Sequence, residues 1–131
     1  MNKILNYLGV DWGEKRIGLA TGDSEVKLAL PLKTVANLAE VLGVIKEDEI
    51  DVIIIGAPKK MSGEEANNPD WVNFVAQLRE RSGKPVETVD ERLSSLAADA
   101  LGGAENETAG RDEIAASIIL QSYLDKQDGG N

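Results

Sequence analysis

Four consecutive β-branched residues, from Val52 to Ile55, constrain the fold more than any other stretch of this sequence. A strand with one wet face alternates apolar and polar residues, whereas an unbroken β-branched run is typical of a strand buried on both faces. Strands of that kind lie inside parallel sheets that carry helices on either side. The run stops at Gly56, and the residues that follow lack a helical period. The sequence therefore predicts an α/β fold with residues 51–56 as a central parallel strand.

Strand and helix patterns alternate along the rest of the chain. The expected strands are residues 4–10, 16–22, 26–35, 51–56 and 84–89, and the expected helices are residues 38–47, 69–82, 96–101 and 111–126. The first two strands form a β-hairpin. Pro31 fits an edge or a bulge of the third strand, because it cannot donate a ladder hydrogen bond. A three-stranded meander followed by alternating helices and strands predicts a mixed sheet with helices on both faces.

The length of 131 residues predicts one domain over residues 1–126, since single domains cluster at roughly 100 to 150 residues. A tail at residues 127–131 should fray. The helices should bury apolar residues that recur at helical spacing. The candidates for these buried faces are Leu38, Val41, Leu42 and Ile45; Val72, Val75, Ala76 and Leu78; and Ile114, Ala115, Ile118, Ile119 and Leu124.

The absence of cysteine and histidine narrows the available chemistry. Without cysteine there are no disulfides, thiolate nucleophiles or cysteine-bound zinc ions. Without histidine the commonest general base and metal ligand is missing. Any reaction must therefore use carboxylates, hydroxyls, lysine and arginine. No stretch approaches the ~20 apolar residues of a membrane span and the N-terminus lacks a signal-peptide pattern, so we expect a soluble, cytoplasmic protein with no membrane partner.

Acidic residues stand at the ends of three expected elements. Asp11 closes the first strand, Asp90 and Glu91 follow the last strand, and Asp112 begins the final helix. In a sheet of this order, ligands bind at the carboxyl ends of the strands. Clustered carboxylates repel one another and are normally held by a cation, and an all-oxygen ligand set selects Mg²⁺ or Mn²⁺. Taken singly, each acid also has a structural role available to it, as a hairpin cap, a surface ion pair or a first-turn residue favoured by the helix dipole.

Basic residues lie beside these acids, although the formal net charge is −9. The overall charge argues against a polyanionic partner, because nucleic-acid-binding proteins usually carry a basic surface. Six basic residues nevertheless flank the acids or follow the central strand: Lys15, Arg16, Lys59, Lys60, Arg92 and Arg111. A basic rim around an acidic, metal-binding floor would suit a phosphodiester. An ordinary solvated surface is the alternative for each of these residues alone.

Four segments resemble the YqgF/RuvX family in order and spacing, and together they span nearly the whole chain. They read GVDWGEKRIGLA (residues 9–20), IGAPKKMSG (residues 55–63), DERLSS (residues 90–95) and RDEIAASIILQSYL (residues 111–124). Members of this family are RNase H-fold proteins described as Holliday junction resolvases and as nucleases in pre-16S rRNA maturation. The resemblance implies a five-stranded, RNase H-like mixed sheet. It also implies a nuclease that hydrolyses phosphodiester bonds in a structured rRNA precursor or in branched DNA.

The same resemblance implies a role for each acid. Asp11, Glu91 and Asp112, with Asp90 beside Glu91, would be the catalytic carboxylates. They would bind divalent ions, Mg²⁺ or Mn²⁺ and two in number, that activate a water and stabilise the leaving oxygen in a two-metal hydrolysis.

The substrate side of the expected site is basic. The expected phosphate contacts are Lys15, Arg16, Lys59, Lys60 and Arg92. The second segment departs from the family pattern, because Met-Ser-Gly stands here where Met-Asp-Gly is usual. This departure leaves the metal-binding acids untouched and concerns the substrate contacts. A homodimer would suit junction cleavage, since two symmetric cuts come most simply from a two-fold enzyme.

Two alternatives stay open. The Asp11-x-Gly13 turn and its returning strand also resemble the first phosphate loop of the actin, Hsp70 and sugar-kinase superfamily, which shares the core fold. Those ATP-dependent proteins need a duplicated domain, which 131 residues cannot hold. The second alternative is a non-catalytic RNase H-like domain that binds RNA or a protein, and the net charge of −9 favours it.

Overall fold

Five strands form one mixed sheet in the computed structural model, which describes residues 3–57, 68–90 and 111–129. The strands are β1 (Asn6–Trp12), β2 (Ile17–Asp23), β3 (Leu30–Val35), β4 (Val52–Ala57) and β5 (Val86–Asp90). β1, β2 and β3 form an antiparallel meander, whereas β4 runs parallel to both β1 and β5. The order across the sheet is β3-β2-β1-β4-β5. The predicted five-stranded mixed sheet is confirmed.

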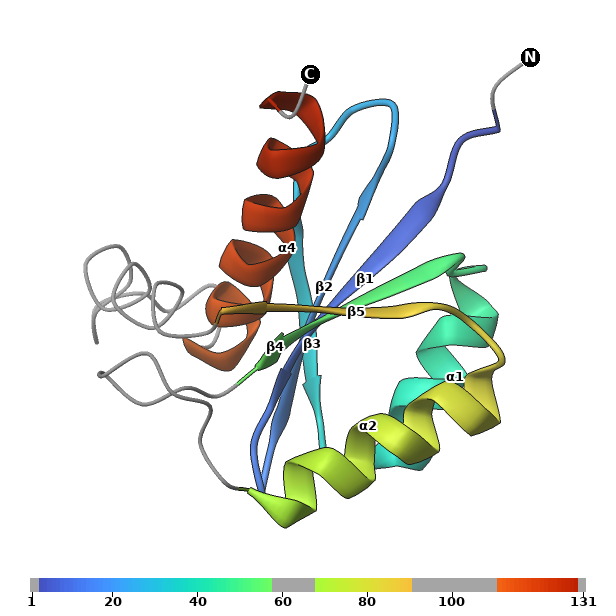
Figure 1. Cartoon of the computed structure of the whole chain (residues 1–131), viewed down its shortest axis with the longest axis vertical. Helices are drawn as coiled ribbons and strands as arrows, with labels where there is room; N and C mark the ends of the chain where they lie inside the picture. Colours follow the sequence, from blue (N-terminus) through green and yellow to red (C-terminus); the bar gives the residue numbers. More distant parts are fainter. Residues whose placement is uncertain (1–2, 58–67, 91–110, 130–131) are drawn as a thin grey trace.

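Helices cover both faces of this sheet (Figure 1). The described helices are α1 (Leu38–Glu47), α2 (Pro69–Ser82) and α4 (Arg111–Gly129). α1 and α2 lie together on one face, and α4 lies on the other. The predicted three-layer arrangement is therefore confirmed. The helix expected over residues 96–101 lies outside the described residues.

β4 contributes to both apolar layers. Ile53 and Ile55 pack against α1 and α2, while Ile54 packs against α4, and none of the three side chains is exposed. This alternation confirms that residues 51–56 contain a strand buried on both faces. It also fixes which positions of the parallel neighbour β1 face each helical layer.

The buried face of α2 differs from the expected one. Trp71, Phe74, Val75 and Leu78 pack toward the sheet, at spacings of three and four residues. The expected core positions Val72 and Ala76 are wrong, because 58% of Val72 is exposed and Ala76 is exposed as well. The aromatic side chains decide the orientation, since they bury more apolar area than a valine. In α1 and α4 the buried face is wider than expected and also includes Val44, Ala116 and Leu120.

Contacts from α4 shorten β3 at its start. The expected strand began at residue 26, but Lys27 has a left-handed backbone with φ of 58°. The Gln121 side chain of α4 accepts from the Ala29 backbone N–H (2.8 Å) and donates to the Lys27 carbonyl (3.1 Å), which holds this stretch off the ladder. Pro31 lies on the edge strand beside a register shift, as predicted. At its own end, α4 continues to Gly129 rather than stopping at Lys126.

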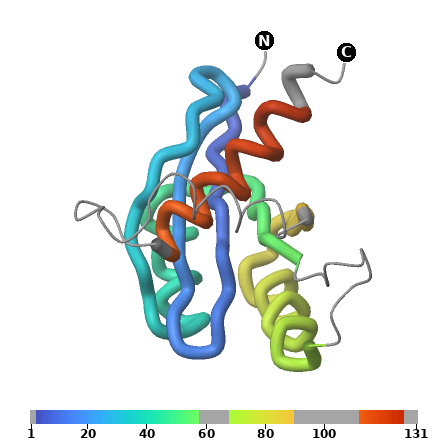
Figure 2. Tube along the Cα trace, turned by 90° about the vertical axis from the view of Figure 1, so that its left-hand side faces the viewer, coloured from blue at the N-terminus to red at the C-terminus, as the bar shows by residue number. Residues whose placement is uncertain are grey.

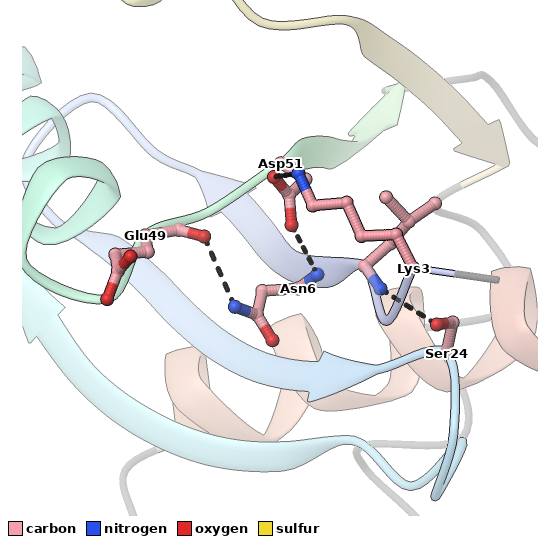
Figure 3. Close-up of polar contacts among 6 residues, drawn as sticks. Lys3, Asn6, Ser24, Glu49 and Asp51 are labelled. Atoms are coloured by element: carbon pink, nitrogen blue, oxygen red, sulfur yellow. Dashed lines mark hydrogen bonds and ion pairs between the residues drawn. The ribbon is translucent and has the colours of Figure 1, made fainter. Parts of the chain in front are cut away.

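The start of β1 is tied to the α1–β4 turn (Figure 3). The Asn6 backbone N–H donates to Asp51 Oδ2 (2.8 Å), and the Asn6 side-chain amide donates to the Glu49 carbonyl (3.2 Å). Lys3 Nζ lies 3.4 Å from Asp51 Oδ1. The hydrogen bond from Asn6 is the main cause that lowers the pKa of Asp51. This network fixes β1 against β4 at the amino ends of both strands.

Candidate active site

Asp11 lies on the face of β1 that α4 covers. Leu8 and Val10 pack into the layer of α1 and α2, whereas Tyr7 packs with α4 residues. Side chains alternate between faces along a strand, so Asp11 shares the α4 face with Tyr7 and Gly9. β1 extends to Trp12, which places Asp11 inside the strand rather than at the hairpin tip. The first strand therefore ends later than expected.

Asp11 begins a row of three positions across β1, β2 and β3. It pairs with Gly18 of β2, and Gly18 pairs in turn with Thr34 of β3. Directly paired residues point to the same face of a sheet. The first turn of α4 lies above this row, because a side chain on Gly18 would overlap the backbone carbonyl of Asp112. Figure 2 shows α4 crossing β1, β2 and β3 on this face.

Two polar contacts connect that first turn to the sheet. Arg16, beside the hairpin tip, holds Asp112 with Nε 3.0 Å from Oδ2. The Thr34 hydroxyl donates to Glu113 Oε1 at 3.1 Å. Arg16 is 74% exposed and the Asp112 side chain 31% exposed, so their ion pair is worth about 0–1 kcal/mol. The ion pair therefore contributes little to the stability of the fold. It shows that the Asp112 side chain is directed toward the hairpin tip.

The remaining predicted residues divide by location. Lys15 is exposed at the hairpin tip, next to Arg16. Asp90 is the last residue of β5 and pairs with Ala57 of β4. Because β1, β4 and β5 are parallel, their carboxyl ends meet at one edge of the sheet, as expected. The predicted residues that lie outside the described part of the chain are Lys59, Lys60, Glu91 and Arg92.

The donors available at this edge suit a hard cation. Asp11 and Asp112 offer only carboxylate oxygens, which Mg²⁺ and Mn²⁺ prefer. Arg16 already places one positive charge against Asp112. Among the residues that the structure describes, no three acidic side chains gather to hold a metal ion. The predicted third ligand, Glu91, lies outside the described residues. The two expected ligands that are described, Asp11 and Asp112, have the chemistry that a divalent ion requires.

Two hollows open elsewhere on the molecule. One of about 360 Å³ is lined by residues such as Asn6, Leu28 and Ile50, and another of about 570 Å³ by residues such as Lys46 and Arg81. Both lie toward the amino ends of β1 and β4, and neither includes Asp11 or Asp112. They are therefore separate from the candidate active site. In the described ranges, no helix has both the length and the apolar character to cross a membrane.

The sequence reasoning missed Gly18, Thr34 and Glu113, which hold the first turn of α4 on the sheet. Gly18 and Glu113 lie within the segments that carry the family resemblance, whereas Thr34 lies between the first and the second of them. Their role depends on the register of β2 against β1 and β3, which no local pattern of residues specifies. One signal in the sequence was available, namely the glycines at positions 9 and 18 in two neighbouring strands. A glycine inside a strand often indicates that another backbone approaches closely.

A family model described as "RuvX: Holliday junction resolvase" matches residues 5–126. This chain belongs to the RuvX family. Two relatives, from Anaeromyxobacter sp. (strain Fw109-5) and Chloroflexus aurantiacus (strain ATCC 29366 / DSM 635 / J-10-fl), carry the name "Putative pre-16S rRNA nuclease". They are 37% and 35% identical to this RuvX-family chain, over 92% and 90% of it. The matches span 97% and 85% of the two relatives.

A solved structure shares the fold of this RuvX-family protein. It is T. thermophilus RuvC in complex with a Holliday junction substrate, with a TM-score of 0.63 at 15% sequence identity. The alignment covers 95% of this chain and 97% of that chain. At this identity the likeness concerns the fold, and it confirms the predicted RNase H-like sheet.

Proposed function

We propose that this protein is a divalent-metal-dependent nuclease that hydrolyses phosphodiester bonds in a structured rRNA precursor. The observation that carries the proposal is the meeting of Asp11 and the Asp112 turn on one face of the sheet, although they come from opposite ends of the chain. Membership of the RuvX family and relatives named as pre-16S rRNA nucleases support it. Branched DNA, named in the family description, is the second candidate substrate.

The metal-binding group would consist of Asp11, Asp112 and Glu91, with Asp90 beside Glu91. Two ions, Mg²⁺ or Mn²⁺, would supply an activated water and stabilise the leaving oxygen. The inclusion of Glu91 is supported by the match to the RuvX family over residues 5–126. Two residues of β5 face the layer of α4: Glu87 accepts from the Tyr123 hydroxyl (3.0 Å), and Val89 packs against the same layer.

The basic side chains would hold the substrate backbone. Lys15 and Arg16 are exposed beside the carboxylates, and Lys59, Lys60 and Arg92 would add to them from outside the described residues. Arg16 is suited to this task, because a guanidinium presents planar donors to phosphate as well as to carboxylate oxygens. A local basic rim of this kind reconciles a polyanionic substrate with a net charge of −9.

Metal-dependent thermal stabilisation tests the first part of the proposal. Mn²⁺ or Mg²⁺ at about 100 times its Kd should stabilise the wild type by about 2.7 kcal/mol relative to EDTA. Asp11→Asn should lose this response because it removes one carboxylate ligand. Asp125→Asn should keep the response, because Asp125 lies about three and a half turns further along α4. No response in the wild type would overturn the metal site, and an unchanged response in Asp11→Asn would exclude Asp11 as a ligand.

Cleavage assays test the second part. A structured pre-rRNA fragment and a four-way DNA junction should be compared at equal concentrations with Mn²⁺, with the Asp11→Asn variant as the inactive control. Preferred cleavage of the RNA is expected. Metal binding by the wild type without cleavage of either substrate would instead support the alternative of a non-catalytic RNA- or protein-binding domain. A cytoplasmic location and a homodimer remain predictions that belong to this proposal.

A further inference from the structure

The first turn of α4 rests on the sheet without a side chain between them. A β-carbon on Gly18 would overlap the backbone carbonyl of Asp112 and lie 2.9 Å from the Asp112 β-carbon. One position outward in the same row, the Thr34 hydroxyl donates to Glu113 at 3.1 Å. Asp11 completes the row on the other side of Gly18. The main chain that carries Asp112 is therefore supported from below by β2 and from the side by β3.

We propose that Gly18 and Thr34 are positioning residues, which set the height and the lateral position of the first turn of α4 and thereby the separation of the Asp112 and Asp11 carboxylates. This inference rests on the proposed nuclease function. Neither residue touches the substrate or the metal in this proposal. Both act through the backbone and the neighbour of Asp112.

The contribution of Gly18 follows from what a side chain would displace. The overlapping atoms belong to the main chain of α4, which cannot rotate away as the end of a flexible side chain can. An added methyl group would therefore lift the first turn from the sheet. Mg²⁺ requires near-ideal octahedral geometry with ligands at about 2.0–2.1 Å, and a misplacement of about 1 Å can lower a rate by about 10²-fold.

The contribution of Thr34 is lateral. Glu113 follows Asp112 directly, so a hydrogen bond to its carboxylate restrains the rotation of the first turn about the helix axis. Thr34 lies in β3, whose position beside Gly18 is fixed by strand pairing. A valine at this position would keep the size of the side chain and remove only the donor.

Gly18→Ala and Gly9→Ala form a matched pair that tests the height. A β-carbon on Gly9 would lie 2.7 Å from the Ala116 carbonyl oxygen and 2.8 Å from the Leu120 β-carbon, so it also crowds α4 but away from Asp112. Both variants should melt at a lower temperature than the wild type. Gly18→Ala should lose the Mn²⁺-induced rise in Tm and about 10²-fold in kcat with little change in KM. Gly9→Ala should keep the Mn²⁺ response and a near-normal kcat.

Thr34→Val and Thr34→Ser test the lateral restraint. If Gly18→Ala fails to fold, these two variants still test the proposed positioning role. Thr34→Val should weaken the Mn²⁺ response and lower kcat several-fold, whereas Thr34→Ser keeps the hydroxyl and should restore both. Equal behaviour of Thr34→Val and Thr34→Ser, or a full Mn²⁺ response and normal kcat in folded Gly18→Ala, would overturn the inference. If Mn²⁺ does not raise the Tm of the wild type, the result would instead overturn the proposed function on which the inference depends.

Discussion

A hydrogen atom in place of a side chain has different consequences at different glycines of this protein. Gly18 and Gly9 lie under α4, where backbone atoms of the helix occupy the space of a β-carbon. Gly43 lies on the exposed side of α1, and a β-carbon there would meet nothing within 4 Å. The first two glycines permit close approach of a helix to a sheet. Gly43 lowers the stability of α1, and no close contact requires a glycine there.

Gly43→Ala should therefore stabilise the protein. Alanine has a higher helix propensity than glycine by about 0.5–1 kcal/mol in a helix interior, mainly because it loses less backbone entropy on folding. The free energy of unfolding, measured by urea denaturation, should rise by about that amount. A decrease would contradict the open surroundings of Gly43.

The candidate site could be predicted from sequence only in its chemistry. Asp11 and Asp112 are predicted as site residues because they are acids at the ends of expected elements, in a chain whose lack of histidine and cysteine leaves carboxylates as the strongest metal ligands. Gly18 and Thr34 could not be predicted in this way. A glycine or a threonine in a strand has the same sequence pattern whether or not a helix packs on it. Their significance depends on strand register and on α4 docking, which are set by the whole fold.

Two of the described helices, α1 and α2, begin at asparagine side chains. The Asn37 side chain accepts from the Glu40 backbone N–H (3.0 Å), and the Asn68 side chain accepts from the N–H groups of Asp70 (3.1 Å) and Trp71 (3.2 Å). Trp71 also donates from its indole nitrogen to the Gly56 carbonyl at the end of β4 (3.0 Å). The cap of α2 therefore affects the edge of the sheet where the candidate active site lies.

Asn68→Ala should destabilise the protein by about 1 kcal/mol, because two backbone donors in the first turn of α2 lose their acceptor. Asn73→Ala is the matched control, since Asn73 is exposed within the same helix and alanine is the better helix former there. Thermal or urea unfolding of the two variants should separate them. Equal stability of the two variants would mean that the cap contributes nothing.

Element types were easier to predict than their faces and ends. The strand at residues 51–56 followed from composition, because no other element tolerates four β-branched residues in a row so well. The face of α2 was misjudged at Val72, since helical spacing alone admits several neighbouring stripes and the aromatic residues select one of them. The start of β3 was misplaced because Gln121, far along the chain, holds residues 27–29.

Asp51 connects the amino ends of the parallel strands β1 and β4. Its carboxylate accepts from the Asn6 backbone N–H, which lowers its pKa below the usual value of 3.8. A carboxyl group whose pKa is lower in the folded protein contributes stability above pH 3.8, and that contribution is lost as the pH falls through the folded-state pKa. Part of the stability of the whole sheet should therefore disappear in acid.

Asp51→Asn should lower the free energy of unfolding at pH 7 by about 1–2 kcal/mol, because a hydrogen bond to a charged acceptor becomes a neutral one. The difference between variant and wild type should shrink at pH 3, because this pH lies below the usual pKa of 3.8 and unfolding of the wild type is then favoured by proton uptake at Asp51. Urea unfolding at the two pH values measures both quantities. A difference that is independent of pH would show that the charge of Asp51 is unimportant.

The docking of α4 on β1 and β2 has a consequence for how the protein is made. Asp11 lies in β1 and Asp112 in α4, so Asp11 is synthesised well before Asp112. Synthesis proceeds from the N-terminus, so until α4 has been made the nascent sheet lacks the apolar cover of one face and also lacks Asp112. In the proposed nuclease, a chain without α4 would carry Asp11 but not Asp112, so cleavage would have to await the docking of this helix.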